Sequence, residues 1–360
     1  MKSVSNKAKP SLNRDLAEKF RHKFVLDLAA LAGMVCTNIG DRLGLYKKMA
    51  EMGPVSAKEL ADATGTKERY IKEWLINQAA GGYVEYEAAT DRFVLPPEHA
   101  AVLADEHSEF FCAGGTEAWL AMARAERRIA ECFKTGHGMN WSEHDAELFS
   151  GTERLFRPAY RTLLFSVWIP SIEGLQERLH AGINVADVGC GYGTSTIVMS
   201  KEFPRSKFWG FDNHAASIEA AKDRAAKEGV AEAISFQTSE AGGFSGDNYG
   251  LIAFFDCLHD MGDPVAAMKR ARQTIAKDGV VMIVEPMGGR TVEENFNPIG
   301  RTLSGASILC CLPNAISSGN HSLGTIATDD ALKKVVTAGG FKHFERVAET
   351  PFNRVFEARV

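Results

Sequence analysis

Residues 185–194 contain three glycines at alternate positions, placed directly after an apolar stretch. The segment reads Val-Ala-Asp-Val-Gly-Cys-Gly-Tyr-Gly-Thr, so Asp187 stands two residues before the first glycine. Glycine has no side chain to hold a ligand away from the backbone, and it tolerates the positive φ angles of tight turns. A carboxylate at the entrance would repel a phosphate group and attract an ammonium group. The pattern therefore predicts a turn that holds a ligand with an ammonium group against its backbone.

A second acidic residue stands where ribose hydroxyls are usually held. Asp212 ends the apolar segment Lys-Phe-Trp-Gly-Phe-Asp, about 20 residues after the glycines, which is the interval expected for a ribose contact. The dinucleotide fingerprint spaces its glycines G-x-G-x-x-G to seat a pyrophosphate at a helix N-terminus. The spacing here is G-x-G-x-G, which speaks against a nicotinamide oxidoreductase. Two acids and three glycines fit a single ligand.

Strand patterns alternate with helical patterns from residue 185 onward. Strands are expected at 185–188, 207–211, 233–237, 250–256 and 279–285. This alternation is typical of a parallel sheet with helices on both faces. Two further strand patterns, 342–348 and 354–360, are separated by Glu-Thr-Pro-Phe-Asn and predict an antiparallel hairpin at the sheet edge. We therefore expect an α/β fold with a mostly parallel, seven-stranded sheet.

The first half of the chain has a different pattern. Residues 1–13 are polar and lysine-rich and are expected to be disordered. Helical periodicity follows to residue 50, and two short helices then precede strand patterns at 83–86 and 92–95. That order predicts a winged helix-turn-helix. Because 360 residues exceed the usual size of a single core, we expect two domains, a mainly helical one at 14–175 and the sheet domain at 176–360.

Many winged helices bind DNA, but the charge of this one speaks against that function. Residues 51–97 hold five basic and eight acidic residues, whereas a surface that follows phosphates should be basic. We therefore favour packing or dimerisation for this domain and expect no nucleic-acid partner. A transcription regulator that senses a ligand through its sheet domain stays open as an alternative.

Composition favours a cytoplasmic protein with neither disulfides nor a metal site. The seven cysteines form an odd set without a C-x-x-C pair, which argues against a disulfide framework and a structural zinc site. His137, Trp141 and His144 lie close together without further ligands at suitable spacing. The apolar stretch 24–36 is short and contains an aspartate, so it predicts a buried helix and no membrane span.

The glycine turn, Asp212 and the closing hairpin together resemble the class I S-adenosylmethionine-dependent methyltransferases, over essentially the whole chain. With a winged helix in front, the chain is most similar to their small-molecule O-methyltransferase type. That resemblance implies a Rossmann-like sheet domain, S-adenosylmethionine as cofactor and S-adenosylhomocysteine as product. It also implies a small-molecule acceptor and a homodimer formed through the N-terminal domain.

Two short sequence motifs resemble those of a narrower group of bacterial enzymes. Leu-His-Asp-Met-Gly-Asp-Pro at 258–264 and Ile-Val-Glu-Pro at 283–286 are similar to methyltransferases of unassigned substrate. They are equally similar to the S-methyltransferases that act on 4-methylthio-2-hydroxybutyrate in dimethylsulfoniopropionate synthesis. Both oxygen and sulfur therefore stay open as the acceptor atom.

The resemblance also implies roles for individual residues. His259 falls on the catalytic base of the plant enzymes, and Glu285 matches an acid that flanks this base, while the second flanking acid aligns with Ile326. The residues expected to bind the cofactor are Asp187, Gly189, Gly191, Asp212, Asn213, Glu240, Ala241 and Asp256.

A further set of residues is expected to bind the acceptor. Its members are Arg157, Tyr160, Trp168, His259, Asn297 and Arg301. An arginine such as Arg301 can hold a carboxylate at two points. A hydroxyl acceptor must lose its proton, for which a neutral histidine is suited. A thioether sulfur has no proton to lose, and His259 would then orient the substrate.

Overall fold

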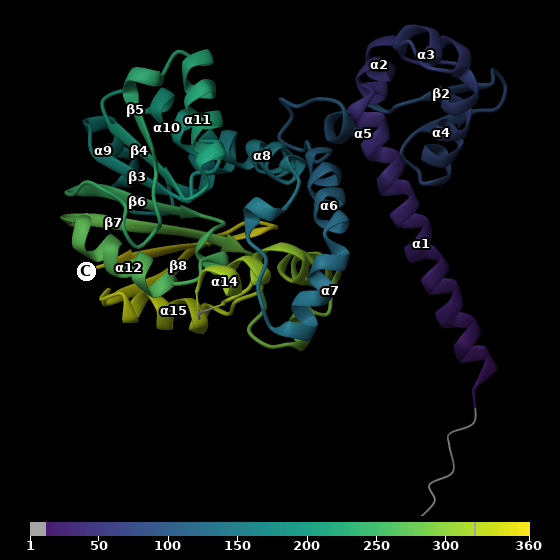
Figure 1. Cartoon of the computed structure of the whole chain (residues 1–360). Coiled ribbons are helices and arrows are strands. Elements are labelled where there is room, and N and C mark those ends of the chain that lie inside the picture. Colours follow the sequence, from purple (N-terminus) through teal and green to yellow (C-terminus); the bar gives the residue numbers. More distant parts are fainter. Residues whose placement is uncertain (1–11, 320–321) are drawn as a thin grey trace, which may run out of the picture. The chain divides into compact units, whose positions relative to one another are not determined.

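A computed structural model describes residues 12–319 and 322–360. Most of the segment expected to be disordered, residues 1–11, therefore lies outside the described residues. The described residues form two compact units, one that ends at Asp105 and one that begins at Glu106 (Figure 1). This division lies earlier than the boundary near residue 175 expected from the sequence. The reason is that residues 106–175 pack on the sheet domain, where Leu164 and Trp168 enter its apolar core and Glu153 forms an ion pair with Arg224 of a covering helix.

The first unit is a small helical domain with a two-stranded wing. Its elements are α1 (Arg14–Arg42), α2 (Leu45–Met52), α3 (Ala57–Thr64), α4 (Glu68–Ala80), β1 (Glu85–Glu87), β2 (Arg92–Val94) and α5 (Pro97–Leu103). Ser56 and Glu59 begin α3 with a reciprocal capping box. Arg92 of the wing donates to both carboxylate oxygens of Glu59, at 2.8 and 2.9 Å. Wing and helices are thus joined as a winged helix-turn-helix requires.

Helix α1 leaves most of its apolar side chains uncovered within the chain. Its last turns pack on α2 and α4, where Trp74 Nε1 donates to the Cys36 carbonyl at 2.8 Å. Leu16, Phe20 and Phe24 are each more than half exposed. The expectation of a buried helix at 24–36 is therefore wrong for a single chain, because α2 and α4 lie at the C-terminal end of α1 (Figure 1).

The length and composition of α1 would also allow it to cross a membrane. Among residues 12–319 and 322–360 it is the one helix of this kind, and 17% of its most apolar window is buried. A single such helix does not distinguish a membrane span from a contact surface.

The second unit is built on a seven-stranded sheet with helices on both faces (Figure 1). The strands are β3 (Asn184–Val188), β4 (Lys207–Asp212), β5 (Ile234–Thr238), β6 (Tyr249–Phe255), β7 (Ile275–Pro286), β8 (His343–Glu349) and β9 (Asn353–Arg359). They lie in the order β5-β4-β3-β6-β7-β9-β8, in which β9 is antiparallel to both neighbours and the first five strands are parallel. The predicted α/β fold, with its Rossmann-like sheet and closing antiparallel hairpin, is confirmed.

Helices cover the sheet and extend beyond its edge. They are α6 (Gly114–Arg124), α7 (Glu126–Thr135), α8 (Ala146–Arg161), α9 (Leu175–Ala181), α10 (Thr194–Glu202), α11 (Ala215–Lys227), α12 (Pro264–Thr274), α13 (Pro298–Ala306), α14 (Leu312–Ser318) and α15 (Asp329–Ala338). Strand β6 shows why both faces need cover: Leu251 and Phe255 enter one apolar core, whereas Ile252 and Phe254 enter the other. The strand order reverses between β3 and β6, and open sheets bind ligands beyond the strand ends at such a point.

Gly193 and Gly229 share a φ angle of 74° but differ in their surroundings. A Cβ atom on Gly193 would lie 2.6 Å from Phe236 Cζ, whereas one on Gly229 would have no heavy atom within 4 Å. Both alanine replacements strain the backbone by about 1 kcal/mol or more. Only Gly193→Ala adds steric overlap, which should cost roughly 1–3 kcal/mol more. Urea denaturation measures the loss in the free energy of unfolding for each variant. Equal losses in Gly193→Ala and Gly229→Ala would contradict the close approach of Gly193 to Phe236.

Candidate active site

A cavity of about 390 Å³ lies in the second unit, at the carboxyl ends of the central strands. The structure brings seven of the eight predicted cofactor-binding residues to its wall. They are Gly189, Gly191, Asp212, Asn213, Glu240, Ala241 and Asp256. These residues come from the turns that follow β3, β4, β5 and β6, so the parallel sheet itself gathers them.

The glycine turn after β3 is tied to the end of β4. Gly189 and Cys190 donate their N–H groups to the Phe211 carbonyl, at 2.7 and 3.0 Å. Gly191, with φ of 52°, donates its N–H to Asp212 Oδ2 at 2.9 Å. A Cβ atom on Gly191 would meet no heavy atom within 4 Å, so the backbone here faces open space. A ligand can therefore approach the turn closely.

Asp212 is held by two backbone groups at the wall of the cavity. Besides Gly191, His214 donates its N–H to Asp212 Oδ1 at 2.9 Å. Burial raises the pKa of Asp212, although these two hydrogen bonds oppose the shift. Each oxygen keeps acceptor capacity beyond its backbone bond, so the carboxylate is oriented and able to accept from a pair of hydroxyl groups.

Asp187 lies beneath the turn and is not part of the cavity wall. Its Oδ2 accepts from Ser195 Oγ at 2.6 Å and from Thr196 Oγ1 at 2.7 Å. Burial raises the pKa of Asp187 to about 6, and its Oδ1 has no hydrogen-bond partner among the described residues. Asp187 therefore joins β3 to the first turn of α10, and a contact between Asp187 and the cofactor stays a prediction.

His259 is enclosed between an acid and a thiol. It lies in the short helix η4 (Leu258–Asp260) and is only 3% exposed. Its Nδ1 is 2.6 Å from Glu285 Oε2, and Cys311 hydrogen-bonds with the same ring. Burial lowers the pKa of His259, but Glu285 and Cys311 outweigh burial and hold it well above its usual value. The acid and the thiol thus favour the protonated ring, and His259 does not line the cavity.

Glu285 and Cys311 complete this buried cluster. Glu285 Oε1 accepts from the N–H groups of Leu258 and His259, at 3.1 and 3.3 Å. The carboxylate thus fixes both the ring and the backbone of η4. The hydrogen bond with Cys310 lowers the pKa of Cys311 and, together with His259, outweighs burial, so the Cys311 pKa lies well below its usual value. The expected His259–Glu285 pair is present, and Cys311 is a member that the sequence analysis missed.

Two further acids line the cavity. Asp256, with φ of 51°, accepts from Asn353 Nδ2 at 3.1 Å through each of its oxygens. Asp260 Oδ2 accepts from Trp141 Nε1 at 2.9 Å. Burial, reinforced by neighbouring groups that carry negative charge, raises the pKa of each acid to about 8. The cavity therefore holds two carboxyl groups that exchange protons near neutral pH.

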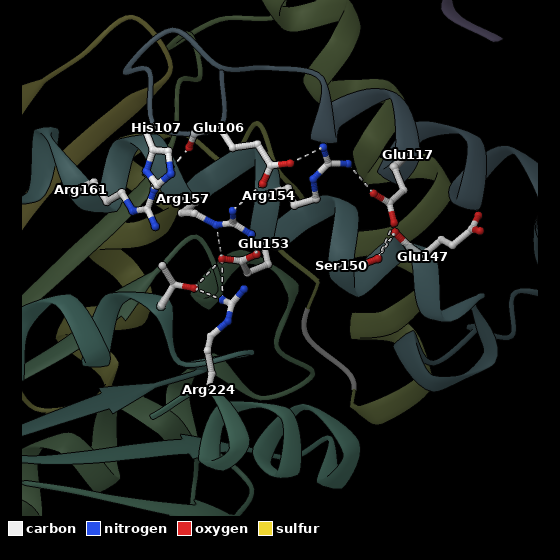
Figure 2. A network of polar contacts seen from close by, with 11 residues as sticks. Glu106, His107, Glu117, Glu147, Ser150, Glu153, Arg154, Arg157, Arg161 and Arg224 are labelled. Atoms are coloured by element: carbon white, nitrogen blue, oxygen red, sulfur yellow. Dashed lines mark hydrogen bonds and ion pairs between the residues drawn. The ribbon is translucent and has the colours of Figure 1, made fainter. Parts of the chain in front are cut away.

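Arg157 lies behind the cavity wall, in a network of ion pairs (Figure 2). It binds both oxygens of Glu153, at 2.9 and 2.5 Å, and its Nη1 donates to Glu106 at 2.9 Å. Glu153, which does line the cavity, is also 2.6 Å from Arg224 and accepts from Thr194 Oγ1 at 2.7 Å. Burial raises the pKa of Glu153, but these partners outweigh burial and lower it to about 2. The Arg157 guanidinium is thus committed to Glu153 and Glu106, away from the predicted acceptor contact.

Of the other residues predicted to bind the acceptor, some line the cavity and others do not. Tyr160 lines the cavity. Trp168 is fully buried one layer behind, stacked on Phe255 with a centroid distance of 5.9 Å. Asn297 begins α13 by accepting from the Gly300 N–H at 2.9 Å, and Arg301 is exposed on the same helix. Neither of these two lines the cavity, because the loop before α13 carries them away from it.

Several aromatic residues of the cavity wall were not predicted from the sequence as site residues. Trp141, Phe149 and Phe156 all line the cavity. Phe149, Glu153, Phe156 and Tyr160 follow the i, i+4, i+7, i+11 spacing of one face of α8. This spacing could have indicated that the four residues share one face of the helix. It does not tell whether that face lines a cavity or packs on apolar residues.

Comparisons with protein families match both halves of the chain. Residues 29–105 match the Rv2258c-like winged HTH domain, and residues 179–336 match the Methyltransferase domain. The ubiquinone biosynthesis O-methyltransferase of Chelativorans sp. (strain BNC1) is 22% identical over 160 residues, which are 44% of this chain. The matched region spans 58% of that relative's length.

Solved structures share the fold over nearly the whole chain. A protein of Nostoc punctiforme described as an O-methyltransferase has a TM-score of 0.73 at 17% identity, covering 98% of this chain and 99% of its own. Mitomycin 7-O-methyltransferase has a TM-score of 0.68 at 17% identity, with coverages of 96% and 100%. The methyltransferase of calicheamicin biosynthesis, solved with S-adenosylhomocysteine bound, has a TM-score of 0.66 at 17% identity, with coverages of 97% and 99%.

Fold and site together define a class I S-adenosylmethionine-dependent methyltransferase. The chain combines a winged helix-turn-helix domain with a methyltransferase domain, and it shares its fold with solved O-methyltransferases. The resemblance to methyltransferases with an N-terminal winged helix is thus confirmed, and the narrower resemblance to S-methyltransferases stays a prediction.

Replacing Glu285 by glutamine should lower the pKa of His259. The change keeps the size of the side chain but removes its negative charge, leaving burial to act on the ring with less opposition. Titration of histidine-labelled protein by NMR measures the shift. Glu345→Gln, on exposed strand β8, is the control and should leave the His259 titration unchanged. An unaltered His259 pKa in Glu285→Gln would contradict the Nδ1–Oε2 hydrogen bond.

Proposed function

We propose that this protein transfers the methyl group of S-adenosylmethionine to a hydroxyl oxygen of a small molecule. The observation that carries this proposal is the cavity at the β3–β4 edge, where an open glycine turn and an oriented carboxylate lie side by side. The cofactor supplies an electrophilic methyl group with a good neutral leaving group. The protein's task is to hold donor and acceptor in line and away from water.

The cavity residues suit the separate parts of this cofactor. Asp212 is positioned to accept from the two ribose hydroxyls. Glu240 and Ala241, after β5, form the wall proposed for the adenine ring. The N-terminus of α10, whose first residue Thr194 lines the cavity, offers N–H groups to the carboxylate of the methionine part. The cluster of Glu285, His259 and Cys311 fixes η4, which forms the wall on the side of the acceptor.

The thioether of 4-methylthio-2-hydroxybutyrate is the sulfur alternative raised by the sequence. Oxygen is favoured for two reasons: the relatives named above are O-methyltransferases, and the cavity holds two carboxyl groups suited to take up a hydroxyl proton. The regulator hypothesis is not favoured, because the matched relatives are enzymes and the wing is acidic.

Asp212→Ala should weaken the binding of S-adenosylmethionine by about tenfold to a hundredfold, because hydrogen bonds to a charged partner are worth about 1.5–3 kcal/mol. Calorimetric titration measures the affinity. Asp223→Asn, an exposed acid on α11, is the matched control and should bind as the wild type does. If Asp212→Ala binds S-adenosylmethionine as tightly as the wild type does, the proposed contact between Asp212 and the ribose is wrong. If the wild type does not bind S-adenosylmethionine at all, the proposed function is wrong.

We further propose that two copies associate through α1, in the cytoplasm. The exposed apolar side chains of α1 recur every three to four residues, which forms a continuous stripe along one helix. A second copy would cover this stripe, in keeping with the dimer implied by the family. All seven cysteines are free thiols, the state that a reducing compartment maintains.

The double substitution Phe24→Glu with Leu31→Glu should convert the dimer to monomers, because each glutamate would bury a charge in an apolar interface. Light scattering after size-exclusion chromatography measures the mass. Lys19→Glu alters an exposed polar position of the same helix and should leave the dimer intact. A wild-type protein that runs as a monomer would contradict this assembly.

A further inference from the structure

Strand β9 carries a fully buried arginine, Arg354. Its side chain is 0% exposed, and it donates to the Pro286 carbonyl at 2.9 Å and to the Ala327 carbonyl at 2.8 Å. Its Nη1 donates to Asp329 Oδ1 at 2.7 Å. Burial of a charged group is costly, and Arg354 is not part of the cavity wall. Contact with a ligand in the cavity therefore does not account for this buried charge.

The register of the sheet places Arg354 beside Glu285. The two residues are directly paired between the antiparallel strands β7 and β9, so their side chains leave the same face of the sheet. Ile283 and Phe356, two positions away on each strand, belong to the apolar core of that face. Glu285 is itself 0% exposed. Because apolar surroundings screen charges weakly, the guanidinium and the carboxylate attract each other across this core.

Asp329, the ion-pair partner of Arg354, neutralises it only in part. This carboxylate begins α15, is 28% exposed, and is shared with Arg346, whose Nη2 donates to Oδ2 at 2.6 Å. Solvent and the second guanidinium both weaken its hold on Arg354. Burial lowers the pKa of Arg354, whereas the charges of Asp329 and Glu285 oppose this shift. Part of the charge of Arg354 thus acts on Glu285.

The proton cycle of His259 gives this charge a function. Glu285 accepts from the backbone of Leu258 and His259 and lies 2.6 Å from His259 Nδ1. While the ring is protonated, its charge compensates the carboxylate. Removal of a hydroxyl proton by His259, the role that the family resemblance implies, requires a neutral ring. Glu285 is then a buried anion without its nearest cation, which is disfavoured, so the pair would keep its proton to a higher pH.

The other titratable groups that face the pair of Glu285 and His259 cannot carry positive charge. They are the carboxyl groups of Asp256 and Asp260 and the thiols of Cys257 and Cys311. Each of these groups is either neutral or negative. Among the described groups that act on the pair, Arg354 is thus the one with a permanent positive charge.

We propose that Arg354 is a positioning residue of this enzyme, whose buried charge keeps Glu285 ionised while His259 is neutral and able to take a proton. This proposal rests on the proposed methyl transfer to oxygen and adds a residue that lies outside the cavity. Arg354 acts through Glu285. Its bonds to the carbonyls of Pro286 and Ala327 also fix the guanidinium at the end of β7, next to the carboxylate that it serves.

Titration of the pair of Glu285 and His259 tests this proposal without an acceptor. NMR of protein with isotope-labelled histidine and glutamate follows the ring and the carboxyl group together. Arg354→Met should raise the pKa at which the pair loses its proton by about half a unit or more, because a nearby cation is removed. A merely structural role predicts the opposite sign, since a loosened pair would return the His259 pKa toward its ordinary, lower value.

Arg346→Met is the matched control. Arg346 also binds Asp329 and also lies over the Phe356 ring, but it is 25% exposed, so its loss should shift the pKa of the pair clearly less. Arg354→Lys keeps the charge and should stay near the wild type. Asp329→Asn removes the negative partner of Arg354 and should lower the pKa of the pair, which provides a second test should Arg354→Met fail to fold.

A pKa that falls or stays unchanged in Arg354→Met would overturn the proposal, as would a rise in Asp329→Asn. The same holds if the wild-type pair keeps its proton over the whole pH range in which the protein is folded, because the neutral ring would then never form. Calorimetric titration of the same wild-type sample with S-adenosylhomocysteine tests the proposed function separately. A wild type that binds but whose variants lack these shifts contradicts the role of Arg354 alone, whereas one that does not bind contradicts the proposed function.

Discussion

The hydrogen bond from the Gly191 N–H to the Asp212 carboxylate joins the two strand ends on which the site depends. The bond can form only because the turn has no side chains and because β3 and β4 lie side by side in parallel. It fixes the carboxylate at the edge of the cavity and keeps the Gly191 backbone open to a ligand. Asp187 supports the same turn from below through Ser195 and Thr196. The Asp212 carboxylate thus lines the cavity, whereas the Asp187 carboxylate holds the glycine turn in place.

Burial of acids without cations governs the acceptor side. Burial makes Asp256 and Asp260 resist ionisation, and the pKa of each rises to about 8. The exception is Glu153, whose partners Arg157 and Arg224 keep it charged. A cation placed beside Asp260 would lower the pKa of that residue. Among the described residues, no lysine or arginine lines the cavity wall, so these two acids keep their raised pKa.

Regular patterns made the sheet and the cofactor side predictable from sequence. Alternating apolar residues located each strand, and the ends of parallel strands necessarily meet at one edge, so Gly189, Asp212 and Glu240 could be placed together. Contacts between distant segments could not be foreseen. Cys311 meets His259 only because the helices after β7 fold back over η4. Arg157 and Phe156 are adjacent on α8, and the sequence does not tell which of them faces the ligand.

Helix α8 shows how the acceptor side depends on the cofactor side. One face of it supplies Phe149, Phe156 and Tyr160 to the cavity, and Glu153 on that face is bonded to Thr194, the first residue of α10 after the glycine turn. Arg157 and Glu106 extend this network toward the start of the second unit (Figure 2). A displacement of the glycine turn would therefore be transmitted to the wall that surrounds the acceptor, because the connecting ion pairs are short and largely shielded from solvent. The positions of donor and acceptor are thus fixed by one connected set of side chains, as an in-line transfer requires.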